Sequence, residues 1–224
     1  MSMSLIVAGV DVGGSKKGFH AVVLQDGAYL DHFKSREAGA IADRCRRIGV
    51  SIIGVDSPCR WNNTDGARLA ERELMKEKIW CFSTPTREIA EIHPKDHFRW
   101  MLKGADLFEC LESSHALFTG DSKQLTRPLC FETFPQAVAC VLAGKIVSAK
   151  KKSSIRRDLL IKSGLDTSRL TNIDQLDAAL CAITAQYFAH NNFKTYGEAL
   201  TGLIVVPRRT ITSPTPRENL GWRG

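Results

Sequence analysis

The residues with the clearest potential for chemistry are acidic, and each falls at an unusual place in the sequence. Two of them end apolar segments, one lies near the end of a third segment, and the last position holds a pair at the start of an expected helix. They are Asp11, Asp56, Glu132, and Asp174 with Asp177. A spacing of three residues places the two members of that pair on one helical face.

Carboxylates at the ends of buried strands need a compensating partner, because removing an ionised group from water is costly. The partner can be a cation, a basic side chain or a hydrogen-bond network. Mg²⁺ or Mn²⁺ is a natural candidate, since these hard ions bind to a few carboxylates together with water and substrate phosphate. Two such ions about 4 Å apart can drive phosphodiester hydrolysis. The alternative is that each acid is only a turn or cap residue.

Basic residues gather in three places and favour a polyanionic partner. The net charge is +7 and the sequence pI is about 9.1. Lys16 and Lys17 follow Asp11 in a glycine-rich turn, and Arg208–Arg209 forms a second cluster. The densest run is Lys150–Lys152 with Arg156 and Arg157. We expect a nucleic-acid backbone to contact Lys16, Lys17, Lys151, Lys152 and Arg156 if these clusters face the carboxylates, although a solvated helix face is the commoner explanation of each cluster taken alone.

The apolar pattern that must position these residues predicts an α/β protein. We expect strands at 5–12, 19–24, 28–33, 51–56, 128–133 and 202–206. Helices are expected at 36–48, 66–78, 95–118 with an interruption at Gly104, 136–142, 153–163 and 173–190, with a loop at 80–94. Asp65 is the expected cap of the second helix. This order favours one mixed sheet with helices on both faces, in a single domain over residues 1–207 followed by a polar, partly ordered tail at 208–224.

Composition excludes several classes of protein. No apolar run approaches the ~20 residues that span a bilayer, and the first residues lack the basic start of a signal peptide. The seven cysteines form no Cys-x-x-Cys pair, which predicts reduced thiols in the cytoplasm and argues against structural zinc. The segment Gly13–Gly18 has the spacing of a phosphate loop, but Phe19-His20 replaces the required Lys-Ser/Thr.

Four motifs in order resemble a known family. They are Gly9-Val10-Asp11, Gly54-Val55-Asp56-Ser57-Pro58, Phe131-Glu132-Thr133-Phe134-Pro135 and Asp174-x-x-Asp177-Ala178-Ala179-Leu180. This set resembles the domain of unknown function 429 family, which is regarded as predicted nucleases with an RNase H-like fold. The last motif is also similar to the terminal helix of RuvC-type resolvases, where an Asp-x-x-Asp-Ala pair completes a metal site.

The resemblance implies an RNase H-like fold and a Mg²⁺ or Mn²⁺ site carried by Asp11, Asp56 and Asp177. Asp174 is a further metal-ligand candidate, and Glu132 is a further catalytic candidate. Asp56 departs from the resolvase pattern, where this position is usually glutamate, and the shorter side chain reaches less far. The pattern Arg68, Glu71 and Arg72 follows Asp56 and either borders the cleft or forms a surface row of ion pairs.

Three functions therefore stand as hypotheses. The first is a metal-dependent nuclease that hydrolyses phosphodiester bonds of DNA or RNA. The second is a catalytically inactive RNase H-like module that binds nucleic acid or protein. The third is a sugar-kinase-like phosphotransferase, because Gly9–Ser15 is similar to the first phosphate-binding hairpin of the actin and hexokinase superfamily, whose core is also RNase H-like.

Overall fold

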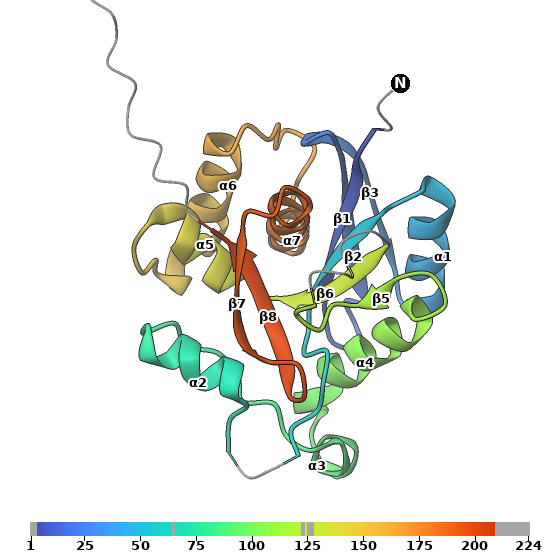
Figure 1. Ribbon diagram of the computed structural model, residues 1–224, viewed down its shortest axis with the longest axis vertical. Coiled ribbons are helices and arrows are strands. Elements are labelled where there is room, and N and C mark those ends of the chain that lie inside the picture. Colours follow the sequence, from blue (N-terminus) through green and yellow to red (C-terminus); the bar gives the residue numbers. More distant parts are fainter. Residues whose placement is uncertain (1–3, 64–65, 122–123, 125–127, 209–224) are drawn as a thin grey trace, which may run out of the picture.

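The computed structural model describes residues 4–63, 66–121, 124 and 128–208. In this part of the chain, eight strands form one mixed sheet (Figure 1). They are β1 (Ile6–Val12), β2 (Phe19–Gln25), β3 (Ala28–Ser35), β4 (Ile52–Asp56), β5 (Ala116–Leu117), β6 (Leu129–Thr133), β7 (Phe193–Glu198) and β8 (Gly202–Pro207). Their order in the sheet is β3-β2-β1-β4-β6-β8-β7, and β5 pairs with β6.

The sheet is antiparallel at its two edges and parallel in its centre. The meander β1-β2-β3 and the hairpin β7-β8 are antiparallel. The pairs β1·β4, β4·β6 and β6·β8 are parallel, so the carboxyl ends of these four strands lie at one edge of the sheet. This edge is where Asp11, Asp56 and Glu132 end or nearly end their strands.

Helices cover both faces of the sheet. They are α1 (Ala38–Ile48), α2 (Leu69–Lys76), α3 (Arg87–Ile92), α4 (Arg99–Leu111), α5 (Pro135–Ala143), α6 (Lys152–Lys162) and α7 (Ile173–Ala189), with short 3-10 turns η1 (Asp96–Phe98) and η3 (Ala149–Lys151). Figure 1 shows α5, α6 and α7 on one side of the central strands and α1 and α4 on the other. Each face has its own apolar core, as expected for strands that are buried on both sides.

The long helix α7 lies unusually close to the sheet because two glycines face it. A Cβ added at Gly9 would lie 2.1 Å from the backbone oxygen of Ala178 and 2.1 Å from the backbone nitrogen of Ala182. A Cβ at Gly54 on the neighbouring strand would lie 2.7 Å from the backbone oxygen of Cys181. The absence of side chains at these positions therefore allows the helix backbone to pack directly on β1 and β4, and it brings the acidic start of α7 near their ends.

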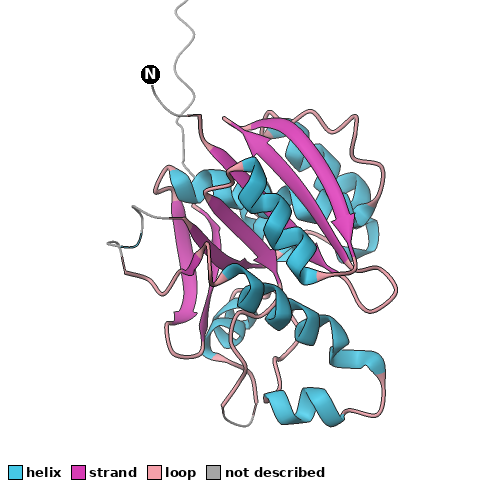
Figure 2. Ribbon diagram, turned by 90° about the vertical axis from the view of Figure 1, so that its right-hand side faces the viewer, coloured by secondary structure: helices cyan, strands magenta, loops and turns pink. Residues whose placement is uncertain are grey.

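The insertion between β4 and β6 carries α2, α3, η1 and α4 (Figure 2). Helix α4 continues through Gly104 without interruption. Glycine at this position serves packing, because a Cβ there would collide with the side chain of Ser57. The expected helix at 95–118 is therefore wrong in its interruption and in its end, which is at Leu111. Helix α2 begins after Arg68, and the expected cap Asp65 lies outside the described residues.

The expected fold class is confirmed: the protein is α/β, with a mixed sheet and helices on both faces, consistent with an RNase H-like fold. Three elements were not predicted, namely α3 inside the expected loop at 80–94, the two-residue strand β5 and the edge strand β7. Within the described ranges, no helix is both long enough and apolar enough to cross a bilayer. The predicted tail lies outside the described residues except for Arg208.

Candidate acidic site

Asp11 and Asp56 form the centre of the candidate site. They are direct partners in the register of the parallel pair β1·β4. Because neighbouring strands lie about 4.8 Å apart and paired residues point to the same face, the two carboxylates project together at the strand ends. Asp11 is buried and Asp56 is partly buried. Among the described residues, neither carboxylate is engaged in an ion pair, which distinguishes them from the other predicted acids.

The electrostatics of this pair favour protonation or a bound cation. Burial, followed by the negative charge of Asp174, raises the pKa of Asp11 from 3.8 to about 7. Burial also raises the pKa of Asp56 well above its ordinary value, and Asp11 adds to this increase. Two adjacent carboxylates that lose contact with water resist ionising together. A positive charge placed between them would remove that resistance.

The two acids of α7 lie close to the pair, but each has a basic partner. Asp177 is buried and forms an ion pair with Arg156 of α6. Asp174 is 2.8 Å from Lys17 Nζ, and its other oxygen is 3.9 Å from His20 Nε2. The side chain of Asn172 caps this helix by accepting from the backbone N–H of Gln175, so Asp174 is not the cap residue.

Arg156 is the principal buried cation of the site. Burial lowers its pKa, and the negative charges of Asp56 and Asp11 partly offset that effect. Its Nε atom is buried without a hydrogen-bond partner among the described residues. The positive charge of this arginine lowers the pKa of both Asp11 and Asp56, which places the guanidinium within electrostatic reach of the central pair. The sequence predicted Arg156 as a phosphate contact, whereas the structure buries it among acids.

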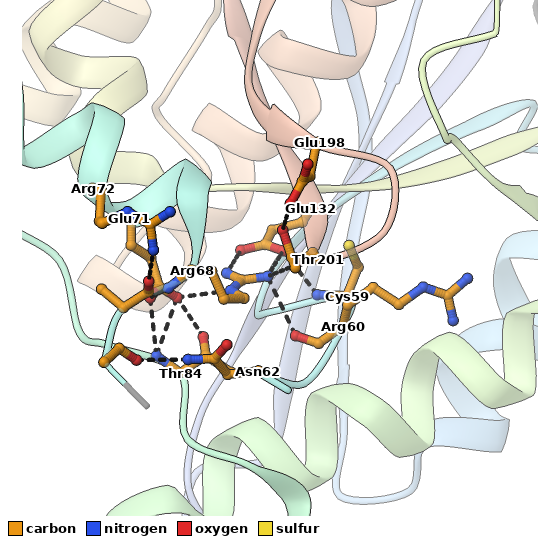
Figure 3. Close-up of polar contacts among 12 residues, drawn as sticks. Cys59, Arg60, Asn62, Arg68, Glu71, Arg72, Thr84, Glu132, Glu198 and Thr201 are labelled. Atoms are coloured by element: carbon orange, nitrogen blue, oxygen red, sulfur yellow. Dashed lines mark hydrogen bonds and ion pairs between the residues drawn. The ribbon is translucent and has the colours of Figure 1, made fainter. Parts of the chain in front are cut away.

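Glu132 belongs to a different cluster, centred on the fully buried Arg68 (Figure 3). Both guanidinium ends of Arg68 donate to Glu132, with distances of 2.9 Å to Oε2 and 2.6 Å to Oε1. The Nε of Arg68 donates to Glu71 at 2.8 Å, and Glu71 also accepts from the hydroxyl of Thr84. The Arg68–Glu71 pair is therefore internal, which corrects the expectation of a surface row of ion pairs.

The Arg68 cluster holds the chain that follows Asp56. The backbone N–H of Cys59 donates to Glu132 at 2.9 Å, and Arg68 donates to the carbonyl oxygens of Arg60 and Thr201 (Figure 3). Glu132 has both oxygens occupied by these donors, so the structure gives it a positioning role beside the acidic pair. No local sequence signal reveals this role, because Arg68 and Glu132 are 64 positions apart. The Arg-x-x-Glu spacing at the start of α2 indicates only the contact in which Glu71 accepts from the backbone N–H of Arg68 at 2.9 Å.

The predicted phosphate-binding residues divide into two groups. Lys16, Lys17, Lys151 and Lys152 are exposed, and Arg156 is buried. The charges of Lys17 and Lys152 lower the pKa of Asp11, so both lysines lie on the side of the molecule that holds the acids. Arg208 is exposed at the end of β8, and its neighbour Arg209 lies outside the described residues.

The structure thus brings together Asp11, Asp56, Asp174 and Asp177 with Lys17, Lys152 and Arg156. No cluster of three or more acidic, histidine or cysteine side chains with metal-binding geometry occurs in the ranges that the structure describes. The central pair supplies two carboxylates, and the cations around it supply contacts for an anion. Two carboxylates next to cationic side chains are the kinds of group that bind a divalent ion together with a phosphate in other proteins.

Comparison with known families gives one match. Residues 9–200 match the model of a family described as a protein of unknown function, DUF429. The chain belongs to this family. The matched range includes all four motifs that carry the acids, so the family resemblance inferred from those motifs is confirmed. Searches among curated proteins and among solved structures give no match for this DUF429 protein.

Proposed function

We propose that this DUF429 protein is a metal-dependent nuclease whose central carboxylates are Asp11 and Asp56. The single observation that carries the proposal is the register of β1 and β4, which pairs two carboxylates that have no basic partner of their own in the described residues. The elevated pKa values of both groups indicate an environment that a cation would stabilise.

The residues present fit one Mg²⁺ or Mn²⁺ ion better than two. Mg²⁺ is commonly held by one or two carboxylates plus water and substrate phosphate, and Asp11 and Asp56 provide that number. Asp177 and Asp174, the other predicted ligands, are occupied by Arg156 and Lys17. A bound ion would supply charge neutralisation at the phosphate and a water molecule acidic enough to act as nucleophile.

The chain's own residues provide the remaining functions. Lys17 and Lys152 are placed to contact phosphate oxygens, because both carry positive charge beside Asp11. Arg156 contributes a buried positive charge that would stabilise the extra negative charge of the reacting phosphate. Glu132, through Cys59, fixes the backbone that follows Asp56 and so holds that carboxylate beside Asp11.

Cleavage assays with labelled single-stranded and duplex oligonucleotides in Mn²⁺ test the proposal. Loss of a group that merely orients a metal ligand costs roughly 10- to 100-fold. We therefore expect Asp11→Asn and Asp56→Asn to lose at least about 100-fold in rate. Asp43→Asn, at an exposed acid of α1 that pairs with Arg46, is the matched control and should cleave like the wild type. Equal rates for all four proteins would reject the assignment.

A second candidate function is a binding module for nucleic acid that needs no metal. It is favoured by the ion pairs Arg156–Asp177 and Lys17–Asp174, which neutralise two of the predicted ligands internally. Isothermal titration with Mn²⁺ separates the two functions. The nuclease proposal expects binding that Asp56→Asn abolishes and that Arg156→Gln strengthens, because the variant frees Asp177. The binding-module proposal expects no Mn²⁺ binding, together with nucleic-acid affinity that Arg156→Gln weakens.

The phosphotransferase hypothesis rests only on the glycine-rich turn after Asp11, in which the backbone N–H of Gly13 donates to the carbonyl oxygen of Gly18 at 2.8 Å. No further feature of the described residues favours it.

We also propose that the protein works in a reducing compartment such as the cytoplasm. The seven cysteines support this proposal, because all of them are free thiols and four are buried.

A further inference from the structure

A cluster of aromatic rings lies on the insertion that precedes β6, and we call it the ring cluster: Phe82, His93, His97, Phe98 and Trp100. The ring centroid of Phe82 is 5.9 Å from that of His97 and 6.1 Å from that of Trp100. The rings of His97 and Phe98 are 4.6 Å apart. Phe82 is 61% exposed even though it contacts two rings, which is costly for a large apolar side chain unless a partner covers it.

The ring cluster shares a small hollow with one member of the acidic pair. Phe82 and Trp100 line a hollow of about 50 Å³ whose wall also includes Asp56 and Ser57. The hydroxyl of Ser57 is buried without a hydrogen-bond partner among the described residues. A hollow of about 50 Å³ has room for water but not for a base, so a planar group would lie on the exposed ring of Phe82 at its edge.

A hydrogen bond joins the segment that carries the ring cluster to the turn after β1, the strand of Asp11. The Oγ of Ser15, in the turn that follows Asp11, donates to Asp96 Oδ2 at 2.9 Å, and Asp96 begins the short turn that carries His97 and Phe98. Ser15 also lines a hollow with four cationic side chains and three acidic ones, including Arg99 and Lys103 of α4, the helix that carries Trp100. This small excess of positive charge on the same helix is compatible with a phosphate backbone.

We propose that the ring cluster is a stacking platform for an unpaired nucleobase, so that the substrate class of the proposed nuclease is single-stranded nucleic acid. This inference rests on the proposed function and deepens it. Aromatic rings stack on the faces of bases with little dependence on sequence, and a paired duplex does not offer those faces. A base on Phe82 would lie near Asp56, because the two residues line the same hollow.

The test measures binding by fluorescence anisotropy in EDTA, where no metal-dependent cleavage occurs. Two labelled probes carry the same number of phosphates: a short oligothymidylate and an abasic strand of equal length. Stacking is worth roughly a 5- to 100-fold change in affinity per base, so the wild type should bind oligothymidylate at least about fivefold more tightly. Phe82→Leu keeps the apolar surface but loses the stacking face, and it should remove this preference. Phe82→Tyr should retain it.

Leu30→Ala, an exposed apolar residue on the edge strand β3, is the matched control and should bind both probes like the wild type. Equal affinity of the wild type for the two probes would overturn the proposal, as would an unchanged preference in Phe82→Leu. Because binding is measured without metal, a failed cleavage assay leaves this test intact. Conversely, if the stacking test fails, the effect of Asp11→Asn on cleavage still tests the proposed nuclease function.

Discussion

Replacing Asp11 by asparagine should stabilise the protein at pH 8 while it weakens the proposed activity. The side chains have nearly the same shape, so the substitution mainly removes a charge. In the folded protein, Asp11 titrates near pH 7, compared with its ordinary value of 3.8, chiefly because it is buried. At pH 8 the folded wild type therefore carries an ionised carboxylate that is shielded from water, and this lowers its stability.

The sign and size of the effect follow from proton linkage. Between pH 3.8 and about 7 the folded state holds a proton on Asp11 that the unfolded state has released, so the free energy of unfolding falls as the pH rises through this window. A gap of about three pH units corresponds to ~4 kcal/mol. Because Asp56 interacts with Asp11, the titration belongs to the pair, and this figure is an upper bound for the single residue.

Urea denaturation at pH 5 and pH 8 in EDTA measures the prediction. About two of the three pH units lie between pH 5 and the folded-state pKa of about 7, so the wild type should lose up to ~2.7 kcal/mol more than Asp11→Asn between the two pH values. Asp43→Asn, the exposed control, should keep the wild-type pH dependence. In Mn²⁺ at one hundred times its dissociation constant, the wild type and Asp43→Asn should regain about 2.7 kcal/mol at pH 8, and Asp11→Asn should not. If the free energy of unfolding depended on pH equally in the wild type and in Asp11→Asn, the reasoning would be refuted, because folding would then not raise the pKa of Asp11.

Three further predictions concern other parts of the site. Glu132→Gln leaves Arg68 without its bidentate partner and should lower the free energy of unfolding by ~3–5 kcal/mol in urea denaturation. Gly9→Ala places a Cβ against the backbone of α7 and should cost about 3 kcal/mol in the same assay. Lys152→Ala should reduce the slope of log affinity against log salt for single-stranded DNA by about one, whereas Lys162→Ala, at the other end of α6, should leave it unchanged.

Each of these predictions has a clear contrary result. A Glu132→Gln protein as stable as the wild type would mean that solvent or another side chain replaces the lost charge. A stable Gly9→Ala protein would show that α7 can move away from β1. Equal salt slopes for Lys152→Ala and Lys162→Ala would remove Lys152 from the proposed phosphate contacts.

Sequence pattern predicted the central elements because their signals are local. The strands that end at Asp11 and Asp56 are continuous apolar runs, and the start of α7 follows an asparagine cap. The edge strand β7 was missed because only one of its residues, Tyr196, is buried, so it lacks the alternation of a half-buried strand. Helix α3 was missed because it has six residues, too few to show a helical period between two prolines.

The partners of the acids could not be predicted, because pairing depends on tertiary contacts. Arg68 and Glu132 are 64 positions apart, and Lys17 and Asp174 are 157 positions apart. The resemblance implied that Asp11 and Asp56 share a site, which spacing alone could not show; the parallel pairing of β1 and β4 brings them together. Nothing in the local sequence indicated that Glu132 would bind an arginine, whereas Asp11 and Asp56 form no ion pair among the described residues.

The hydrogen bonds of Arg68 also have a consequence for how the protein is made. A chain is synthesised from its N-terminus, and Arg68 emerges well before two of its acceptors, Glu132 and the carbonyl of Thr201. Until the last hairpin has left the ribosome, the segment after Asp56 lacks part of its anchor. The acidic pair is therefore held in its final geometry only when translation of the domain is almost complete, and chains that end before Thr201 should lack a fully formed site.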